Sequence, residues 1–417
     1  MSMKERKLAR VRTREIGGGS GASCWNRHKR ALWIVAALLL AGAAPAAEPE
    51  LPTSLRIGTS GDYAPFSVFP ENALAPHGAA EPAGFDIEVA RRFAREAGLR
   101  IEWVPFRWPE LAPDLAAGRF DVAMSGVTWT PDRATSGYLT RAVAASAPCW
   151  LGDETPKRVG VNRGGALERF ARQRFPDAAI TAVDRNRSLP DLLARGEVDA
   201  IVTDRFEIRS FRRGAWPEHC EPASERKVYW VAPARAKDLG PRLDAWLARN
   251  EPAIDALRAT WLGGSAPRSE ADHLLDLAAR RLALMPLVAR AKAARGLALV
   301  DPAREQQVLE AVRARAKAAK LDADSVEALF RLQIELGTRV QQRATAAIAA
   351  APLLDLGEAL RPAISGVGDR IVASLAGSAP LSPASLDAAD AAPLAPWLEP
   401  AEQRALRDAI LAVRPAR

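Results

Sequence analysis

Residue types that could hold a metal or a nucleotide are sparse in this chain. Its four histidines are scattered, and no Cys/His spacing suits zinc: His28, His77, His219 and His273. Gly164 and Gly165 precede a helical stretch, but the Lys-Ser/Thr of a phosphate-binding loop does not follow them. Neither a metal nor another cofactor is therefore expected. The bare backbone N–H groups of Gly164 and Gly165, together with the helix dipole, instead suit a carboxylate.

The elements that must position such a site are readable from the hydrophobic pattern. From Leu55 to about Trp230, short β-type runs alternate with amphipathic helical stretches, as in LRIGTS, GFDIEVARRFAREAG and LRIEWVPF. This rhythm implies a mainly parallel sheet covered by helices. Because a second set begins at KRVGVNRGG, two α/β lobes are expected, with ligand bound between them at the carboxyl ends of the strands.

The pattern changes after Trp261. The segment LGGSAPRSE breaks the chain, and apolar residues then recur at helical spacing, with helices expected at about 269–294, 302–319, 322–350, 354–376 and 399–414. A solvated coiled-coil appendage is the alternative. Interrupted helices of unequal length without a sustained heptad favour a compact helical domain.

The first 46 residues have the features of an export signal. Residues 1–30 hold nine Lys or Arg and two Glu, which is +7 of the net charge of +8. The apolar run Ala31–Ala46 is short for a membrane span and ends in a small-x-small cleavage pattern at Ala44 to Ala46. A periplasmic protein without a stable membrane span is expected, with an uncleaved anchor or a mis-assigned start codon as alternatives. Since the rest of the chain is nearly neutral, nucleic-acid binding is not supported.

The cysteines are consistent with an oxidising compartment. Cys24 lies in the predicted signal, so Cys149 and Cys220 are the one possible pair in the mature chain. Two separately buried thiols are the alternative.

Residues 55–262 resemble the polar amino-acid-binding proteins of the family 3 solute-binding class. The matching segments are GTSGDYAPFS, AGFDIEVARRFA, GRFDVAMSGVTWTPDRA and VDAIVTD. The resemblance implies that Arg133 holds a ligand carboxylate, aided by the segment from Ser125 to Thr128. Finer matches, VNRGGALERFAR, TDRFEIR and PFRWPEL, resemble the cyclohexadienyl dehydratases, which look like solute-binding proteins that acquired catalysis.

That second resemblance implies an acid-catalysed loss of carbon dioxide and hydroxide from prephenate. Glu207 would be the general acid, kept protonated by burial near apolar side chains, and Asp204 would lie beside it. Asp62 and Trp108 would line the pocket from the first lobe. The chain departs from the dehydratases at Val143, where a lysine is expected; Arg141, two residues earlier, is a candidate source of that charge.

Residues 270–417 resemble the secreted AroQ-class chorismate mutases. The pattern is carried by Arg281, Lys292, Asp301, Arg304 and Glu305, then by Gln341 and, in RPAISGVGDRIV, by Arg370. The resemblance implies that arginines from three helices, Arg281, Arg304 and Arg370, grip two carboxylates. Lys292 and Gln341 would donate to the breaking ether oxygen, while Glu305 or the backbone near Asp301 would receive the ring hydroxyl. Two departures are the absence of a late disulfide and Gly337 in place of a hydroxyl residue.

The sequence thus predicts a signal (1–46), an α/β two-lobed dehydratase domain of periplasmic-binding-protein type (47–262), a linker (263–269) and an all-α chorismate mutase domain (270–417). The expected activity is conversion of chorismate through prephenate to phenylpyruvate, with arogenate as a further substrate. The alternatives are a mutase fused to an amino-acid receptor, and a mutase fused to a degenerate dehydratase. The oligomeric state is left open.

Overall fold

The computed structural model describes residues 53–69, 81–211, 216–264, 268–344, 352–377 and 381–416. The predicted signal at 1–46 and residues 345–350 of the helix expected at 322–350 lie outside these residues, as do positions 265–267 of the predicted linker. Residues 53–417 form one compact unit, which contains an α/β part and a helical part.

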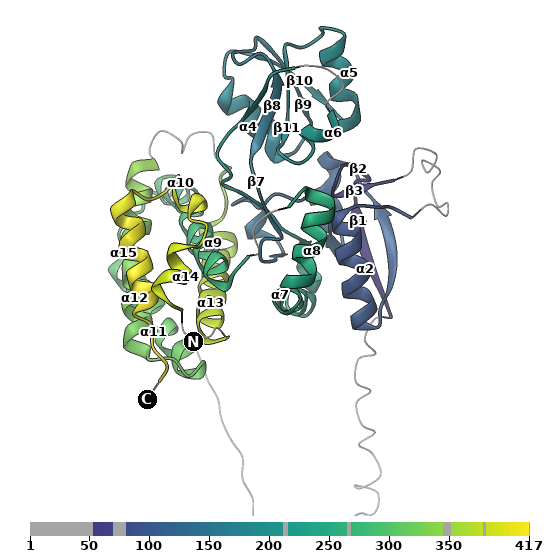
Figure 1. Cartoon of the computed structure of the whole chain (residues 1–417). Helices are drawn as coiled ribbons and strands as arrows, with labels where there is room; N and C mark the ends of the chain where they lie inside the picture. Colours follow the sequence, from purple (N-terminus) through teal and green to yellow (C-terminus); the bar gives the residue numbers. More distant parts are fainter. Residues whose placement is uncertain are drawn as a thin grey trace, which may run out of the picture. The chain divides into compact units, whose positions relative to one another are not determined.

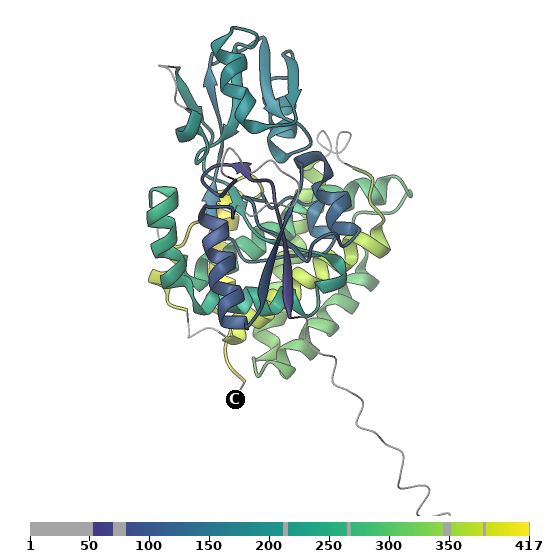
Figure 2. The same ribbon diagram turned by 90° about the vertical axis from the view of Figure 1, so that its right-hand side faces the viewer.

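The α/β part consists of two lobes, each built on a five-stranded sheet (Figures 1 and 2). In lobe one, β1 (Ser54–Thr59) pairs in parallel with β4 (Arg100–Pro105) and with β5 (Val122–Ala123). β14 (Trp230–Val231) then runs antiparallel between β5 and β6 (Tyr138–Leu139). α2 (Phe85–Ala97), α3 (Leu111–Ala116), α7 (Leu239–Arg249) and α8 (Glu251–Leu262) complete the lobe.

Lobe two repeats the plan in the order β10-β9-β11-β8-β12. Its strands are β8 (Pro148–Gly152), β9 (Arg158–Asn162), β10 (Ala179–Val183), β11 (Ala200–Asp204) and β12 (Glu218–Cys220). α4 (Ala166–Arg174), α5 (Leu189–Ala194) and α6 (Ile208–Phe211) accompany them. Cys149 of β8 and Cys220 of β12 face each other across the antiparallel pair and form a disulfide.

Two short antiparallel strands connect the lobes. β7 (Ala144–Ser146) leads from lobe one to lobe two, and β13 (Glu225–Lys227) leads back. We call β7 and β13 the hinge strands. The two lobes have separate apolar clusters except for Phe206, which follows β11 and packs in the cluster of lobe one against Phe66.

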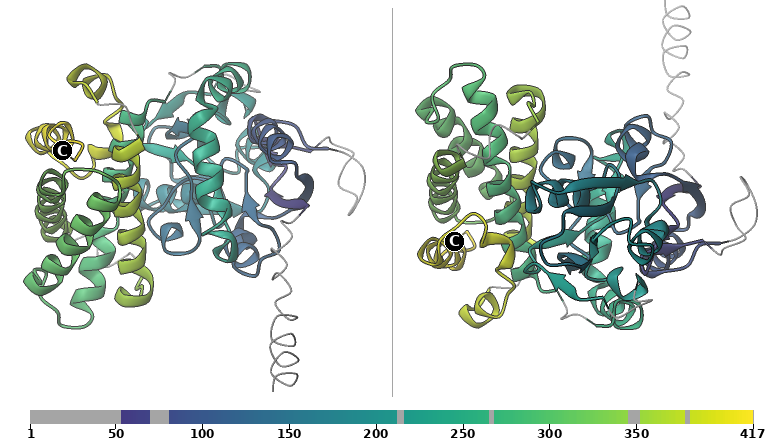
Figure 3. Two further views of the ribbon diagram at one scale, coloured as in Figure 1. Left: turned by 90° about the horizontal axis from the view of Figure 1, so that it is seen from below. Right: turned by 90° about the horizontal axis from the view of Figure 1, so that it is seen from above.

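After Ser269 the described chain is helical (Figure 3). α9 (Glu270–Ala283) begins at a capping box of Ser269 and Asp272, and α10 (Met285–Ala293) follows it after Leu284. The single helix expected at 269–294 is therefore two helices, because Pro286 cannot donate the backbone hydrogen bond that continuity requires.

The remaining helices surround a core of Leu, Val and Ile side chains. They are α11 (Pro302–Ala318), α12 (Ala323–Arg343), α13 (Arg361–Gly377), α14 (Pro383–Asp387) and α15 (Pro400–Leu411). A π-helical turn, η7 (Leu356–Leu360), leads into α13. Among the described residues no helix is long and apolar enough to cross a membrane.

Candidate active sites

The cleft between the α/β lobes is closed. Its cavity measures about 30 Å³, which is roughly the share of liquid volume of one water. Contacts cross it: the Asn186 N–H donates to Asp62 Oδ2 at 3.3 Å, and Arg169 pairs with Asp132 at 3.0 Å. A ligand of the size of an amino acid can enter only when the lobes separate at the hinge strands.

Glu207 does not itself line this cavity; it is bonded to Asn186, which does, and is 1% exposed. Its carboxyl oxygens accept from Thr203 Oγ1 at 2.6 Å and from Asn186 Nδ2 at 3.1 and 3.2 Å. Burial raises the pKa of Glu207 well above its ordinary value, and the negative charge of Asp204 raises it further. Burial and Asp204 thus favour the protonated form of Glu207, the form that can donate a proton.

Asp204, at the end of β11, is the charged counterpart of Glu207. Burial alone would raise its pKa, but the ion pair with Lys227 at 2.8 Å and the hydrogen bond from Tyr63 outweigh burial and lower it. Asp204 Oδ1 also accepts from the backbone N–H groups of Phe206 and Glu207. The pKa values of the two neighbouring carboxyls, Asp204 and Glu207, are thus shifted in opposite directions.

Lys227 is a cleft residue that the sequence analysis missed. It is 1% exposed, and its Nζ donates to Tyr63 Oη at 3.1 Å and to Thr128 Oγ1 at 3.0 Å besides pairing with Asp204. Val143, where a lysine was expected, donates its backbone N–H to the carbonyl of Lys227 at 2.8 Å. The neighbouring hinge strand thus supplies a cation beside the expected position.

Arg141 does not supply that cation. Its guanidinium pairs with Glu270 at 3.1 Å, and its backbone N–H donates to Asp244. Arg141 and Val143 do not share a strand face, because β7 begins only at Ala144.

Of the other predicted cleft residues, those that line the cavity are Trp108, Thr128, Arg133 and Gly165. Arg133 donates to the Thr128 carbonyl at 2.7 Å, and burial lowers its pKa to about 10, so it remains a cation at neutral pH. Burial raises the pKa of Asp62, whose Oδ1 is buried without a hydrogen-bond partner.

Two residues that were predicted to contact the ligand form hydrogen bonds with other protein groups instead. Ser125 Oγ bonds to the hydroxyls of Ser60 and Ser67, which holds the loop between β1 and α2. The Gly164 N–H donates to Glu168 at 2.7 Å, so it is not available to a ligand carboxylate in this closed state. Gly164 still requires glycine, because its φ is +76° and a Cβ would lie 2.9 Å from Pro109.

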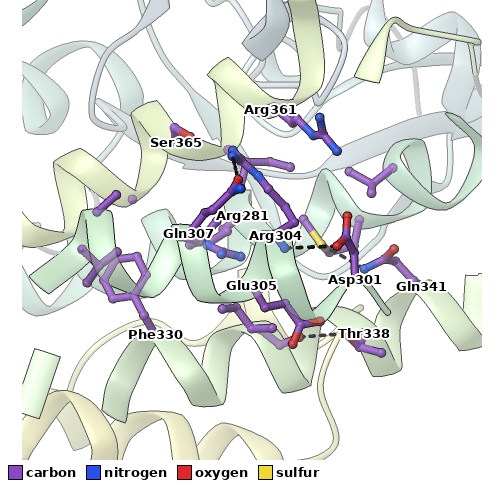
Figure 4. Close-up of a pocket in the computed structure, with 18 of the residues that line it drawn as sticks. Arg281, Asp301, Arg304, Glu305, Gln307, Phe330, Thr338, Gln341, Arg361 and Ser365 are labelled. Carbon is purple, nitrogen blue, oxygen red and sulfur yellow. Dashed lines mark hydrogen bonds between the residues drawn. The ribbon is translucent and has the colours of Figure 1, made fainter. Parts of the chain in front are cut away.

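A second cavity, of about 240 Å³, lies among the helices of the C-terminal part. Figure 4 shows Arg281, Arg304 and Arg361 around it, from α9, α11 and α13. The other predicted residues that line it are Lys292, Asp301, Glu305 and Gln341. Arg281 is 5% exposed, and its Nε is buried without a partner. Burial lowers the pKa of Arg281 to about 10, so the cavity is cationic at neutral pH.

Local capping places several of these groups. Asp301 caps α11 by accepting from the Arg304 N–H at 3.1 Å, which fixes the first turn that carries Arg304 and Glu305. Lys292 donates to the Leu299 carbonyl across the α10–α11 loop. Thr338 lines the cavity beside Gly337 and supplies a hydroxyl one residue after the position where one was expected.

Arg370 does not line this cavity. Its guanidinium donates to the Leu139 carbonyl at 2.5 Å and to Asp244 at 3.3 Å, and it lies 4.7 Å from the centroid of the Tyr138 ring, all in lobe one. Arg361, nine residues earlier on the same helix, takes the place proposed for Arg370. Nine residues are two and a half helical turns, so the two side chains emerge on opposite faces of α13.

These two arrangements define a two-lobed binding-protein fold joined to a helical domain with a cationic cavity. The chain belongs to the bacterial extracellular solute-binding proteins, family 3, whose family model matches residues 55–264. The model for chorismate mutase type II matches residues 272–342. The predicted fold class, a two-lobed α/β domain followed by a helical mutase domain, is confirmed.

Individual relatives resemble the first domain. Cyclohexadienyl dehydratase of Pseudomonas aeruginosa is 33% identical over 180 residues, which is 40% of this chain and 64% of that protein. The arginine-binding extracellular protein ArtP of Bacillus subtilis is 29% identical over 217 residues, 50% of this chain and 80% of ArtP. A crystal structure of an ancestral amino-acid-binding protein, described as a precursor of cyclohexadienyl dehydratase, is 26% identical and covers 50% of this chain and 96% of its own, with a TM-score of 0.45.

Proposed function

We propose that the chain is an exported bifunctional enzyme that rearranges chorismate to prephenate and converts prephenate to phenylpyruvate, with arogenate as a further substrate that would give phenylalanine. The observation that carries the dehydratase half is Glu207, a buried carboxyl with a raised pKa beside the cleft of a binding-protein fold. The relationship to cyclohexadienyl dehydratase supports this half, and the mutase family match supports the other.

In the dehydratase step Glu207 gives its proton to the leaving ring hydroxyl. The electron pair of the bond to the ring carboxylate enters the ring, carbon dioxide and water depart, and the ring becomes aromatic. Arg133 is the candidate partner for the side-chain carboxylate, which it can hold by a charge-assisted pair. Since the closed cleft has no room for prephenate, each turnover includes opening at the hinge strands.

The mutase step needs no proton. One carbon–oxygen bond breaks while a carbon–carbon bond forms within chorismate, so the domain has only to hold the reactive conformer and stabilise charge on the ether oxygen. Arg281, Arg304 and Arg361 can neutralise the two carboxylates. Lys292 and Gln341 lie in the same cavity as donors for the ether oxygen.

The alternative is a mutase fused to an amino-acid receptor. In that alternative Glu207 would contact the ligand amine. The raised pKa of Glu207 weighs against it, because an ammonium group pairs best with an ionised carboxylate.

Export is part of the proposal, since the matched family is extracellular and residues 1–46 have the features of a signal. The test is to incubate purified residues 47–417 with chorismate and follow its loss together with phenylpyruvate. If chorismate is lost but prephenate accumulates, and the protein binds an amino acid tightly, the first domain is a receptor rather than a dehydratase.

A further inference from the structure

Helix α9 of the mutase domain forms hydrogen bonds with hinge strand β13 and with the segment that precedes hinge strand β7. Asp276 Oδ1 accepts from Arg226 Nε of β13 at 2.7 Å, and both side chains are buried. One turn later, Arg280 Nη1 donates to the Thr140 carbonyl, just before β7, at 2.8 Å. Arg226 is further held by Asp390 at 2.7 Å. The helical domain therefore fixes the segment about which the lobes of the other domain move.

The residue after Arg226 is Lys227. Neighbouring residues of a strand point to opposite faces, so the strand that presents Arg226 to the helical domain presents Lys227 to the cleft. Backbone bonds hold this arrangement: the Trp129 N–H donates to the Arg226 carbonyl, and the Val143 N–H donates to that of Lys227, both at 2.8 Å.

Lys227 in turn controls the surroundings of the acid. The charged and polar groups that face Glu207 are Asp204, Asp62, Thr203 and Asn186. Lys227 holds Asp204 ionised, and the charge of Asp204 opposes ionisation of Glu207. Beside Asp204, Lys227 also contacts Tyr63 and Thr128, with the carboxyl of Glu225 nearby. A shift of Lys227 away from Asp204 would let Asp204 take up a proton and would remove that opposition.

We propose that Asp276 of the mutase domain is a positioning residue of the dehydratase cleft, acting through Arg226 on Lys227 and through Lys227 on the acid Glu207. The inference rests on the proposed function. The proposal makes the dehydratase activity depend on Asp276, a side chain of the helical part that lies outside the cleft and outside the binding-protein fold.

The test compares Asp276→Asn with Glu270→Gln in the full chain. Glu270→Gln is the matched control, because it also removes an ion pair between α9 and the α/β part, the one with Arg141, but leaves β13 untouched. For Asp276→Asn we expect kcat for prephenate dehydration to fall about tenfold and its alkaline limb to move to lower pH by about one unit, the size of one modest change in a neighbouring charge. Glu270→Gln should match the parent within about twofold, and Asp276→Glu should restore the limb.

Thermal unfolding and mutase activity report whether each variant is folded. Asp276 also pairs with Arg268, so Arg226→Met, which breaks only the contact with β13, is tested beside Asp276→Asn with the same expected result and replaces it if that variant does not fold. An unchanged alkaline limb in a folded variant overturns the inference, as does an equal effect of Glu270→Gln.

A carboxyl-carbon NMR titration of Glu207, assigned by its loss in Glu207→Gln, makes the inference testable without catalysis. If the parent does not dehydrate prephenate, the proposed function fails, and this titration alone decides. A lower pKa of Glu207 in Asp276→Asn than in the parent then supports the inference, and equal values overturn it.

Discussion

The cleft between the two lobes and the cavity of the helical part carry charge in opposite ways. The cleft is about 30 Å³, and beside it lie Glu207, whose pKa is raised by burial, and the buried Asp204–Lys227 ion pair. The cavity is about 240 Å³ and is lined by Arg281, Arg304 and Arg361. The first site contains a buried carboxyl with a raised pKa, and the second contains a cluster of arginines.

The difference follows from the chemistry proposed for each site. Removing a hydroxide requires a proton donor, and a carboxyl stays protonated at neutral pH only where burial and a like charge disfavour its ionised form. A rearrangement within one molecule requires only orientation and charge stabilisation, which arginines give without changing protonation state. Buried arginines are costly when unpaired, so a dianionic ligand is a natural partner for this cavity.

The largest expected effect comes from removing the proton. Glu207→Gln keeps the size and hydrogen-bonding capacity of the side chain but cannot donate a transferable proton, so prephenate dehydration should fall by roughly 10²–10⁴-fold while prephenate still binds. Stopped assays of phenylpyruvate and equilibrium dialysis of prephenate measure the two properties. Mutase activity is the control and should not change. Dehydration at the parental rate would remove Glu207 from the role of acid.

The next effect tests which arginine of α13 serves the mutase. Arg361→Ala should lower kcat for chorismate by roughly 10²–10³-fold, as expected for loss of one preorganised donor, and Arg304→Ala should do the same. Arg370→Ala is the matched control on the same helix and should leave mutase activity within a few-fold of the parent. Dehydration should persist in Arg361→Ala. The reverse ranking of Arg361 and Arg370 would contradict the arrangement described above.

The pH dependence of the two activities should also differ. The active form of Glu207 is protonated and its pKa is raised, so dehydration should persist to higher pH than an ordinary carboxylic acid would allow and decline above the raised pKa, by about tenfold per pH unit. Arg281, with a pKa lowered to about 10, stays charged across the neutral range, so mutase activity should stay flat until near that value. Rates from pH 5 to 10 in one preparation measure both. A shared alkaline limb at neutral pH would contradict the assignment.

Removing the disulfide is expected to have the smallest effect on catalytic activity. Cys149→Ser with Cys220→Ser removes a link that closes a loop of 71 residues in sequence separation, which should lower the free energy of unfolding of the α/β domain by about 4 kcal/mol. Denaturant unfolding followed by Trp fluorescence measures the change. Mutase activity at 25 °C should be the same with and without the bond, because both cysteines lie in lobe two.

Several site residues could be predicted because local sequence carries their position. Asp204 and Glu207 follow a β-type run directly, so the end of β11 places both. Asp301, Arg304 and Glu305 occupy the cap and first turn of α11, where Pro302 marks the start of the helix. These three residues lie within one helical turn, so their positions in the sequence fix their relative positions in the site.

The misassignments involve residues whose partners are distant in sequence. Arg361 and Arg370 are both on α13, and only the packing of that helix against α9 and α11 shows that Arg361 faces the cavity while Arg370 faces Tyr138. Lys227 is 23 residues from Asp204 and 164 from Tyr63, and no periodicity links a three-residue strand to either.

The sequence by itself therefore determined the order of elements, the two kinds of fold and the ends of the elements where acids and caps lie. It did so because hydrophobic period and capping chemistry act over a few residues. Only the tertiary structure decided that the cleft is closed, that Lys227 replaces the cation expected at Val143, and that Asp276 of the helical part holds the strand beside it. Those are electrostatic contacts between elements far apart in the chain, and their energies depend on burial and distance that only the assembled fold sets.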